Sequence, residues 1–204
     1  MTGLADMAAI FAGGEGRRMG GVDKGALVVG GMPMWRRVSD RLSPQARGLA
    51  VIAPVRPAWM DGAASAMWIA DAAVASGPGA ALLGALRWLE TEAGADALLL
   101  TAPVDAPFLP EDLFARLEAA RVTAGAPAAL VRHADGLHPV FGLWKAGCAQ
   151  AVEQALQEER ALHRIAAKAG AVECGGWQRG SPDPFANLNS PEDVAAAETF
   201  LRRL

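Results

Sequence analysis

Residues 11–24 read Phe11-Ala12-Gly13-Gly14-Glu15-Gly16-Arg17-Arg18-Met19-Gly20-Gly21-Val22-Asp23-Lys24, and they continue the apolar run Met7 to Ala12. An apolar run that ends in glycines is typical of a buried strand followed by a ligand-binding loop at the carboxyl edge of a parallel sheet. Glycines let backbone N–H groups approach phosphate oxygens closely, and Arg17, Arg18 and Lys24 place cations beside them. The stretch therefore predicts an anion-binding loop on an α/β fold.

The loop matches neither of the two common phosphate-binding patterns. In a Walker loop the lysine precedes serine or threonine, whereas Lys24 precedes Gly25, so no hydroxyl is placed for Mg²⁺. In the dinucleotide pattern G-x-G-x-x-G, a third glycine would follow Gly14 and Gly16 at position 19, which is Met19. An NAD-binding or P-loop function is therefore disfavoured.

Short apolar runs alternate with longer helical patterns along the rest of the chain, which is typical of a mostly parallel sheet with crossover helices. Helices are expected after Pro33, at Leu109 to Leu113 with Pro110 in the first turn, and after Ser190 as N-cap. We expect one domain spanning residues 1–204. The expected strands are Met7 to Ala12, Leu49 to Ala53, Met67 to Ala70, Ala97 to Thr101, Ala128 to Val131 and Val140 to Trp144.

Charge and composition exclude several classes of protein. A formal net charge of -3 provides no basic field, so we expect no nucleic acid as partner. No apolar run approaches the length of about 20 residues that a membrane helix needs, so we expect no membrane association and a cytoplasmic location. Cys148 and Cys174 lack the spacing of a zinc site and are expected to be buried, idle thiols.

Two aspartates follow expected strands. Asp105 comes after the run ending at Thr101 and lies between Pro103 and Pro107, and Asp71 comes directly after Met67 to Ala70. Carboxylate oxygens at the carboxyl edge of a sheet can hold Mg²⁺, which takes one or two carboxylates and completes its shell with water and substrate phosphates. The alternative is that each aspartate only forms a turn or caps a helix.

Six motifs follow one another along nearly the whole chain: Phe11 to Lys24, Asp71, Gly77-Pro78, Pro103 to Pro107, His138-Pro139 and Phe185 to Asp193. Together they resemble the molybdenum cofactor guanylyltransferases. The resemblance implies a three-layer Rossmann-like nucleotidyltransferase fold. It also implies transfer of GMP from GTP to the molybdenum-molybdopterin cofactor, with release of pyrophosphate.

The resemblance also implies roles for individual residues. Lys24, Asp105 and Arg18 would be catalytic, and Asp105 would hold Mg²⁺ as the cofactor. GTP and the molybdopterin cofactor would be the substrates, and molybdoenzymes or their chaperones would receive the product. The nucleotide would contact Ala12, Gly13, Gly14, Lys24, Asp71 and Asp105, and the acceptor would contact Gly77, Pro78, His138, Asn187 and Asn189.

The chain departs from the family pattern at two places. Where the family often has an asparagine that holds the base, this chain has Ala53, and Val104 and Ala106 replace the cysteine and threonine that usually flank the metal-binding aspartate. Three alternatives therefore stay open: a cytidylyltransferase acting on the same cofactor, a nucleotidyltransferase with another phosphorylated acceptor, and a non-catalytic cofactor carrier.

Overall fold

The structure is a computed structural model and describes residues 3–13, 23–63, 66–73, 76–178 and 180–203. The first half of the chain contains β1 (Met7–Phe11), β2 (Val28–Val29), β3 (Met32–Pro33), α1 (Met34–Leu42), η2 (Ser43–Gln45), β4 (Leu49–Ile52), η3 (Ala58–Gly62), β5 (Ala66–Ile69) and α2 (Pro78–Ala93). The second half contains β6 (Leu98–Pro103), α3 (Leu113–Ala124), β7 (Ala128–His133), β8 (Gly136–Lys145), η4 (Ala146–Cys148), α4 (Ala149–Glu158), α5 (Leu162–Lys168), β9 (Ala171–Cys174) and α6 (Pro191–Leu201).

Seven strands of the described chain form the central sheet, in the order β5-β4-β1-β6-β8-β7-β9. Strands β5, β4, β1 and β6 pair in parallel, and β7 pairs in parallel with β9. Strand β8 is antiparallel to both of its neighbours, β6 and β7. The prediction of a mostly parallel sheet is therefore confirmed, and one reversed strand separates its two parallel parts.

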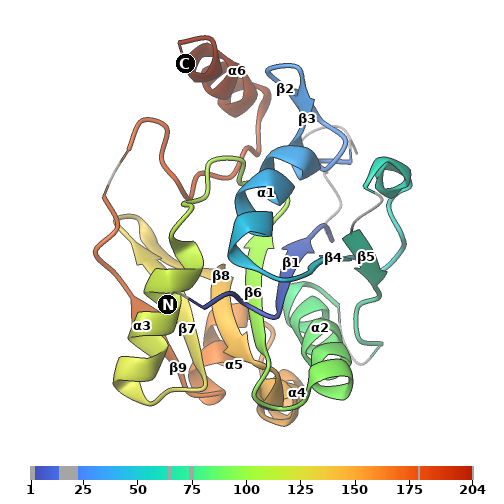
Figure 1. Cartoon of the computed structure of the whole chain (residues 1–204), viewed down its shortest axis with the longest axis vertical. Helices are drawn as coiled ribbons and strands as arrows, with labels where there is room; N and C mark the ends of the chain where they lie inside the picture. The colour runs from blue at the N-terminus through green and yellow to red at the C-terminus, as the bar shows by residue number, and fades with distance from the viewer. Residues whose placement is uncertain (1–2, 14–22, 64–65, 74–75, 179, 204) are drawn as a thin grey trace.

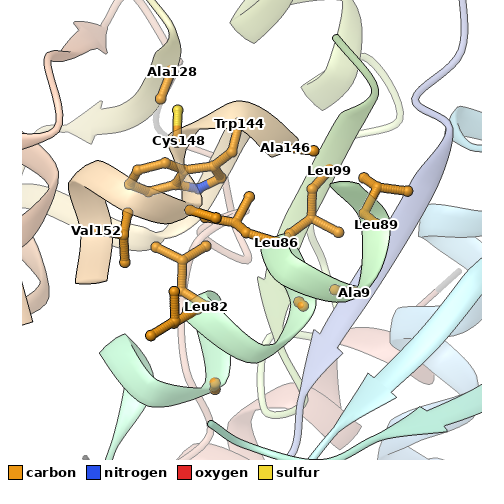
Figure 2. Close-up of a cluster of buried hydrophobic side chains, with 14 of the residues drawn as sticks. Ala9, Leu82, Leu86, Leu89, Leu99, Ala128, Trp144, Ala146, Cys148 and Val152 are labelled. Carbon is orange, nitrogen blue, oxygen red and sulfur yellow. The ribbon is translucent and has the colours of Figure 1, made fainter. Parts of the chain in front are cut away.

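Helices cover both faces of the sheet, so the fold has three layers. On one face, α2, α4 and α5 bury leucines and alanines against Ala9, Phe11 and Leu99. Figure 2 shows Leu82, Leu86 and Leu89 of α2 gathered beside Leu99 of β6 and Trp144 of β8. On the opposite face, α1 and α3 cover the alternate residues of the same strands, such as Ala8 and Ile10. Strands buried on both faces explain the continuous apolar runs in the sequence.

The hairpin β2–β3 and helix α6 lie beyond the carboxyl ends of β1 and β6, at the top of Figure 1. They share a small apolar cluster of Val29, Met34, Leu188 and Ala197. The last helix therefore packs above the edge of the sheet where a ligand-binding site is expected.

The predicted strands all occur, with ends that differ by a few residues. The helix expected to contain Pro110 in its first turn begins later, at Leu113. The side chain of Gln45 explains this difference, because its Nε2 donates to Pro110 O at 2.9 Å and its Oε1 accepts from Phe114 N at 2.8 Å. Both cysteines are buried, and burial raises the pKa of the Cys148 thiol to about 11. Within the described residues, no helix is long and apolar enough to cross a membrane.

Candidate active site

The candidate site lies at the carboxyl ends of β1, β5 and β6. Gly13 follows β1, Asp71 follows β5, and Asp105 follows β6. Strand β1 pairs with β6 directly, and Val104 N extends this pairing by donating to Phe11 O at 3.0 Å. The sheet therefore brings residues from distant parts of the sequence to one edge.

Lys24 and Asp105 are in direct contact at this edge. Lys24 Nζ lies 2.7 Å from Asp105 Oδ2, although the two residues are 81 positions apart. Their side chains are only 22% and 12% exposed, so the ion pair is weakly screened by water. The other carboxylate oxygen, Asp105 Oδ1, is buried and has no hydrogen-bond partner among the described residues. A buried carboxylate oxygen with unused lone pairs can accept a cation.

A close packing contact fixes the backbone beside Lys24. The Asp23 carboxylate accepts a hydrogen bond from Gly25 N at 2.9 Å, which is a common turn geometry. A Cβ at Gly25 would lie 2.5 Å from the indole ring of Trp59, so a larger residue here would have to displace that ring. Trp59 in turn stacks on Trp35, with ring centroids 5.6 Å apart. This packing holds the start of the Lys24 side chain close to the sheet edge.

The segment Phe185 to Ser190, here called the C-terminal strap, reaches the same ion pair. Lys24 Nζ donates a second hydrogen bond to Asn189 Oδ1, and Leu188 N donates to the backbone oxygen of Asp105 at 2.8 Å. The sequence predicts that Asn189 contacts the acceptor. In the structure its side chain is hydrogen-bonded to Lys24, one of the predicted catalytic residues. The lysine therefore joins the first loop of the chain to the strap.

A capping box at the start of α6 anchors the strap. Asp193 Oδ2 accepts hydrogen bonds from Asn189 N and Ser190 N, both at 2.9 Å, and Ser190 Oγ accepts from Asp193 N at 3.2 Å. The predicted N-cap role of Ser190 is confirmed. The bond from Asn189 N is the main reason that the pKa of Asp193 lies below its ordinary value.

We predict that Asp193→Ala lowers the free energy of unfolding by about 1 kcal/mol, the usual cost of losing a helix cap. Because the folded-state pKa of Asp193 is lowered, its stabilising effect is complete above the ordinary pKa of 3.8 and is lost as the pH falls through the folded-state value. The Tm difference between the variant and the wild type should therefore be full at neutral pH and vanish in acid. Glu192→Ala, which removes the exposed neighbouring acid, is the control and should change Tm little. Equal effects of the two variants would contradict the prediction.

Asp71 lies next to Gly13 on the other side of the site. A Cβ built on Gly13 would lie 3.9 Å from Asp71 Oδ2 and 3.5 Å from Pro54. Asp71 Oδ1 is buried and unpaired within the described part of the chain, and burial raises the pKa of this carboxyl group. Two of the predicted nucleotide contacts, Gly13 and Asp71, therefore face each other. Gly14 and Arg18 lie outside the described residues, as does Arg17.

The residues predicted to contact the acceptor are in different surroundings. Gly77 is the N-cap of α2, with a φ of 86°, and Pro78 is the first residue of that helix. Asn187 is exposed, and its backbone oxygen accepts from Asn189 Nδ2 at 3.4 Å. His138 Nε2 lies 2.7 Å from Asp135 Oδ1, and this hydrogen bond is the main reason that the pKa of Asp135 is lowered.

Sequence reasoning missed the aromatic cluster that holds the beginning of the strap. Phe185 is buried at its centre, with ring centroids of four residues between 5.1 and 5.8 Å away: His133, His138, Phe141 and Trp177. His133 Nε2 lies 3.1 Å from Asp183 Oδ2, two residues before Phe185. The residues come from two stretches, 133–141 and 177–185, and the motifs quoted from the sequence pointed only to His138 and Phe185.

Comparisons with known proteins agree with this geometry. The family model of the MobA-like NTP transferase domain matches residues 8–172. A molybdenum cofactor guanylyltransferase from Cereibacter sphaeroides is 44% identical over 199 residues, which cover 95% of this chain and 96% of the relative. The chain belongs to the molybdenum cofactor guanylyltransferase family. A further member, from Rhodopseudomonas palustris (strain BisB5), is 38% identical and covers 98% of this chain and 95% of its own length.

Solved structures show how widely the fold of these guanylyltransferases is shared. Molybdopterin-guanine dinucleotide biosynthesis protein A from Archaeoglobus fulgidus has a TM-score of 0.77 at 22% identity and covers 97% of this chain and 100% of its own. The 4-diphosphocytidyl-2C-methyl-D-erythritol synthase from Anaerococcus prevotii has a TM-score of 0.70 at 14% identity, with coverage of 98% and 97%. The predicted family and the nucleotidyltransferase fold are therefore confirmed. As a member of this family, the chain is a nucleotidyltransferase.

Proposed function

We propose that this chain transfers GMP from GTP to the molybdenum-molybdopterin cofactor, releasing pyrophosphate and giving the guanine dinucleotide form of the cofactor. Its membership of the guanylyltransferase family supports the reaction class. The contact between Lys24 Nζ and Asp105 Oδ2 at the carboxyl edge of the sheet supports a catalytic role for these two residues. A pre-arranged cation beside a buried carboxylate suits a reaction that gathers negative charge on phosphate oxygens.

The acceptor phosphate supplies the nucleophile for this reaction. A phosphate monoester is already anionic near neutral pH, so the protein need not provide a strong general base. The main barrier is repulsion between the acceptor and the triphosphate, together with the charge that grows on the leaving pyrophosphate. In our proposal Lys24 opposes that charge, with Arg18 and the amides of Gly13 and Gly14 beside the phosphates, while Ala12, whose amide donates to Ile52 O at 2.9 Å, contacts the nucleotide in another way.

Asp105 is the residue we propose for Mg²⁺. Its buried Oδ1 has no partner among the described residues, and its Oδ2 is already neutralised by Lys24, so one oxygen fits a hard cation. The described residues hold no group of three or more histidines, cysteines or acids that could bind a metal, so the triphosphate and water would complete the shell. Mg²⁺ bound there would withdraw negative charge from the phosphate oxygens.

Nucleoside and acceptor are proposed to bind on opposite sides of Lys24. For the nucleoside side we propose Asp71, which faces Gly13. For the acceptor side we propose Gly77, Pro78, His138, Asn187 and Asn189. Asn189 Oδ1 accepts a hydrogen bond from Lys24. We therefore propose that binding of the acceptor to the strap changes the position of Lys24 beside the phosphates.

A side-by-side assay tests the proposed reaction. The full chain is mixed with molybdenum-molybdopterin cofactor, Mg²⁺ and either labelled GTP or labelled CTP, and pyrophosphate release is followed. We expect pyrophosphate and label transfer with GTP only. Transfer from CTP would show that the chain is a cytidylyltransferase. CTP is the relevant comparison because Ala53 replaces the asparagine that often holds the base in this family. Binding of GTP and cofactor without pyrophosphate release would show a carrier.

We predict that Asp71→Asn stabilises the protein while weakening its use of GTP. Because burial raises the folded-state pKa of Asp71 above 3.8, the folded protein loses stability as the pH rises from 3.8 through that value. Removing the charge should raise Tm at neutral pH, because the neutral amide avoids the cost of burying a charged carboxylate. The KM for GTP should rise because the nucleoside loses a charged partner.

The measurement is the Tm of both proteins from about pH 4 to pH 7, where their difference should grow with pH. Glu92→Gln, which removes an exposed acid on α2, is the control and should give a Tm difference that changes little over this range. A lower Tm for Asp71→Asn at neutral pH would contradict the prediction.

A further inference from the structure

Helix α2 approaches the backbone around Asp71 unusually closely at one residue, Gly84. A Cβ built on Gly84 would lie 2.6 Å from Ala70 O, 3.1 Å from Ala72 N and 3.4 Å from the carbonyl carbon of Asp71. All three are backbone atoms, so the clash cannot be relieved by rotating a flexible side chain. Any residue larger than glycine must move the helix or the segment that carries Asp71.

A hydrogen bond fixes the same segment to the same helix. Ala72 N donates to Ala80 O at 3.1 Å, and Ala80 lies one helical turn before Gly84. Residues 70–72 are therefore held to α2 at two points, one on each side of Asp71. The rest of α2 is anchored in the core by Leu82, Leu83, Leu86 and Leu89, each at most 2% exposed.

The Asp71 carboxylate depends on this backbone for its position. Its Oδ1 is buried and has no hydrogen bond within the described residues, and its Oδ2 faces Gly13. A side chain whose own oxygens are not held by donors moves with the backbone that carries it. A shift of the helix at residue 84 would therefore displace the carboxylate relative to the loop after β1.

We propose that Gly84 is a positioning residue: by omitting a Cβ it lets α2 hold Asp71 at the place where the carboxylate recognises the nucleoside of GTP. This inference rests on the role proposed above for Asp71. A glycine inside a helix has a cost in stability relative to alanine. At this position the close approach of helix and segment offsets that cost.

The test is Gly84→Ala, with Gly79→Ala as matched control. Gly79 lies in the same helix and is also crowded, but a Cβ there would meet side-chain ends, Leu156 Cδ2 at 2.8 Å and Ile165 Cδ1 at 2.9 Å, which can rotate aside. GTP affinity of the full chain with Mg²⁺ is measured at 10 °C by calorimetry and by the GTP-induced shift in Tm, which also reports affinity for a less stable variant.

We expect Gly84→Ala to weaken GTP binding about tenfold, as for a displaced charged hydrogen-bonding group, and Gly79→Ala to change it by less than about twofold. In steady-state kinetics the KM for GTP should rise in Gly84→Ala while the KM for the acceptor stays unchanged. In the double variant Asp71→Ala/Gly84→Ala, GTP should bind no more weakly than in Asp71→Ala alone, because both changes remove the same interaction.

The possible failures are distinguishable. Unchanged GTP binding in Gly84→Ala, or losses that multiply in the double variant, would overturn the positioning role alone. Failure of Gly84→Ala to fold at 10 °C, with Gly79→Ala folded, would also overturn it, because Gly84 would then serve only the fold. Normal GTP binding by Asp71→Ala would overturn the assignment of Asp71 and this inference with it. A wild-type chain that binds GTP but releases no pyrophosphate would contradict the proposed function only.

Discussion

Lys24→Ala and Asp105→Ala should each lower kcat for GMP transfer by about 10²–10³-fold, the usual effect of removing one pre-arranged group that stabilises charge in the transition state. Lys24 is the described cation closest to Asp105, and Asp105 supplies the buried oxygen proposed for Mg²⁺. The measurement is label transfer from GTP at saturating substrates. Circular dichroism and Tm would show that both variants keep the fold.

Lys145→Ala is the matched control for these variants. Lys145 forms an ion pair with Asp96 that is also 2.7 Å long, but its side chains are 37% and 93% exposed. It lies at the opposite end of β6, where Lys145 pairs with Leu98. Exposed ion pairs contribute little to stability, so both transfer and Tm should stay close to the wild type. Near-normal turnover in Lys24→Ala or Asp105→Ala would refute the assignment of the catalytic residues.

Phe185→Ala should have the largest effect on stability. The side chain is 1% exposed, and its removal would leave a cavity among the surrounding rings. Large-to-small changes of buried aromatic residues cost about 3–5 kcal/mol. At about 2–4 °C for each kcal/mol, the expected fall in Tm is roughly 6–20 °C. The strap would also lose the anchor at its first residue, so GMP transfer by the folded fraction should weaken.

Phe200→Ala provides the comparison for this second variant. Phe200 is a partly exposed phenylalanine of α6 that packs edge-on against Phe108, with ring centroids 5.7 Å apart. Its removal deletes the same atoms from a less buried place, so the Tm should fall by a smaller amount. Thermal melts followed by circular dichroism measure both changes. Equal falls in the two variants would contradict the prediction that the more deeply buried ring of Phe185 contributes more to stability.

Local patterns were sufficient to predict most of the fold. Continuous apolar runs identified the strands buried on both faces, such as Leu98–Pro103, because these residues face helices on either side. Strand β9 was missed because Ala171–Cys174 is short, contains Glu173 and is only partly buried at the sheet edge. The hairpin β2–β3 was missed because each of its strands has two residues. The late start of α3 depends on Gln45, a contact across the fold that no local pattern reports.

The site was predictable where topology decides it. Gly13, Asp71 and Asp105 each follow a strand of the parallel part of the sheet, so their common location follows from chain direction. The contact between Lys24 and Asn189 was not predictable, because 165 residues separate the partners and no periodic pattern links them. The same holds for the hydrogen bond between His133 and Asp183, because it depends on the path of the irregular segment before the strap. No sequence pattern singled out Gly84, because what distinguishes it is the backbone of residues 70–72 that it approaches.

The reach of the C-terminal strap has a consequence for biosynthesis of the enzyme. Ribosomes make the chain from its first residue, so Lys24 emerges long before its partner Asn189 and the Asp193 that anchors it. A nascent or prematurely terminated polypeptide ending before this region cannot complete the centre, even with its whole central sheet already translated. Incomplete translation products should therefore be inactive in GMP transfer, even where they keep Gly13, Lys24, Asp71 and Asp105.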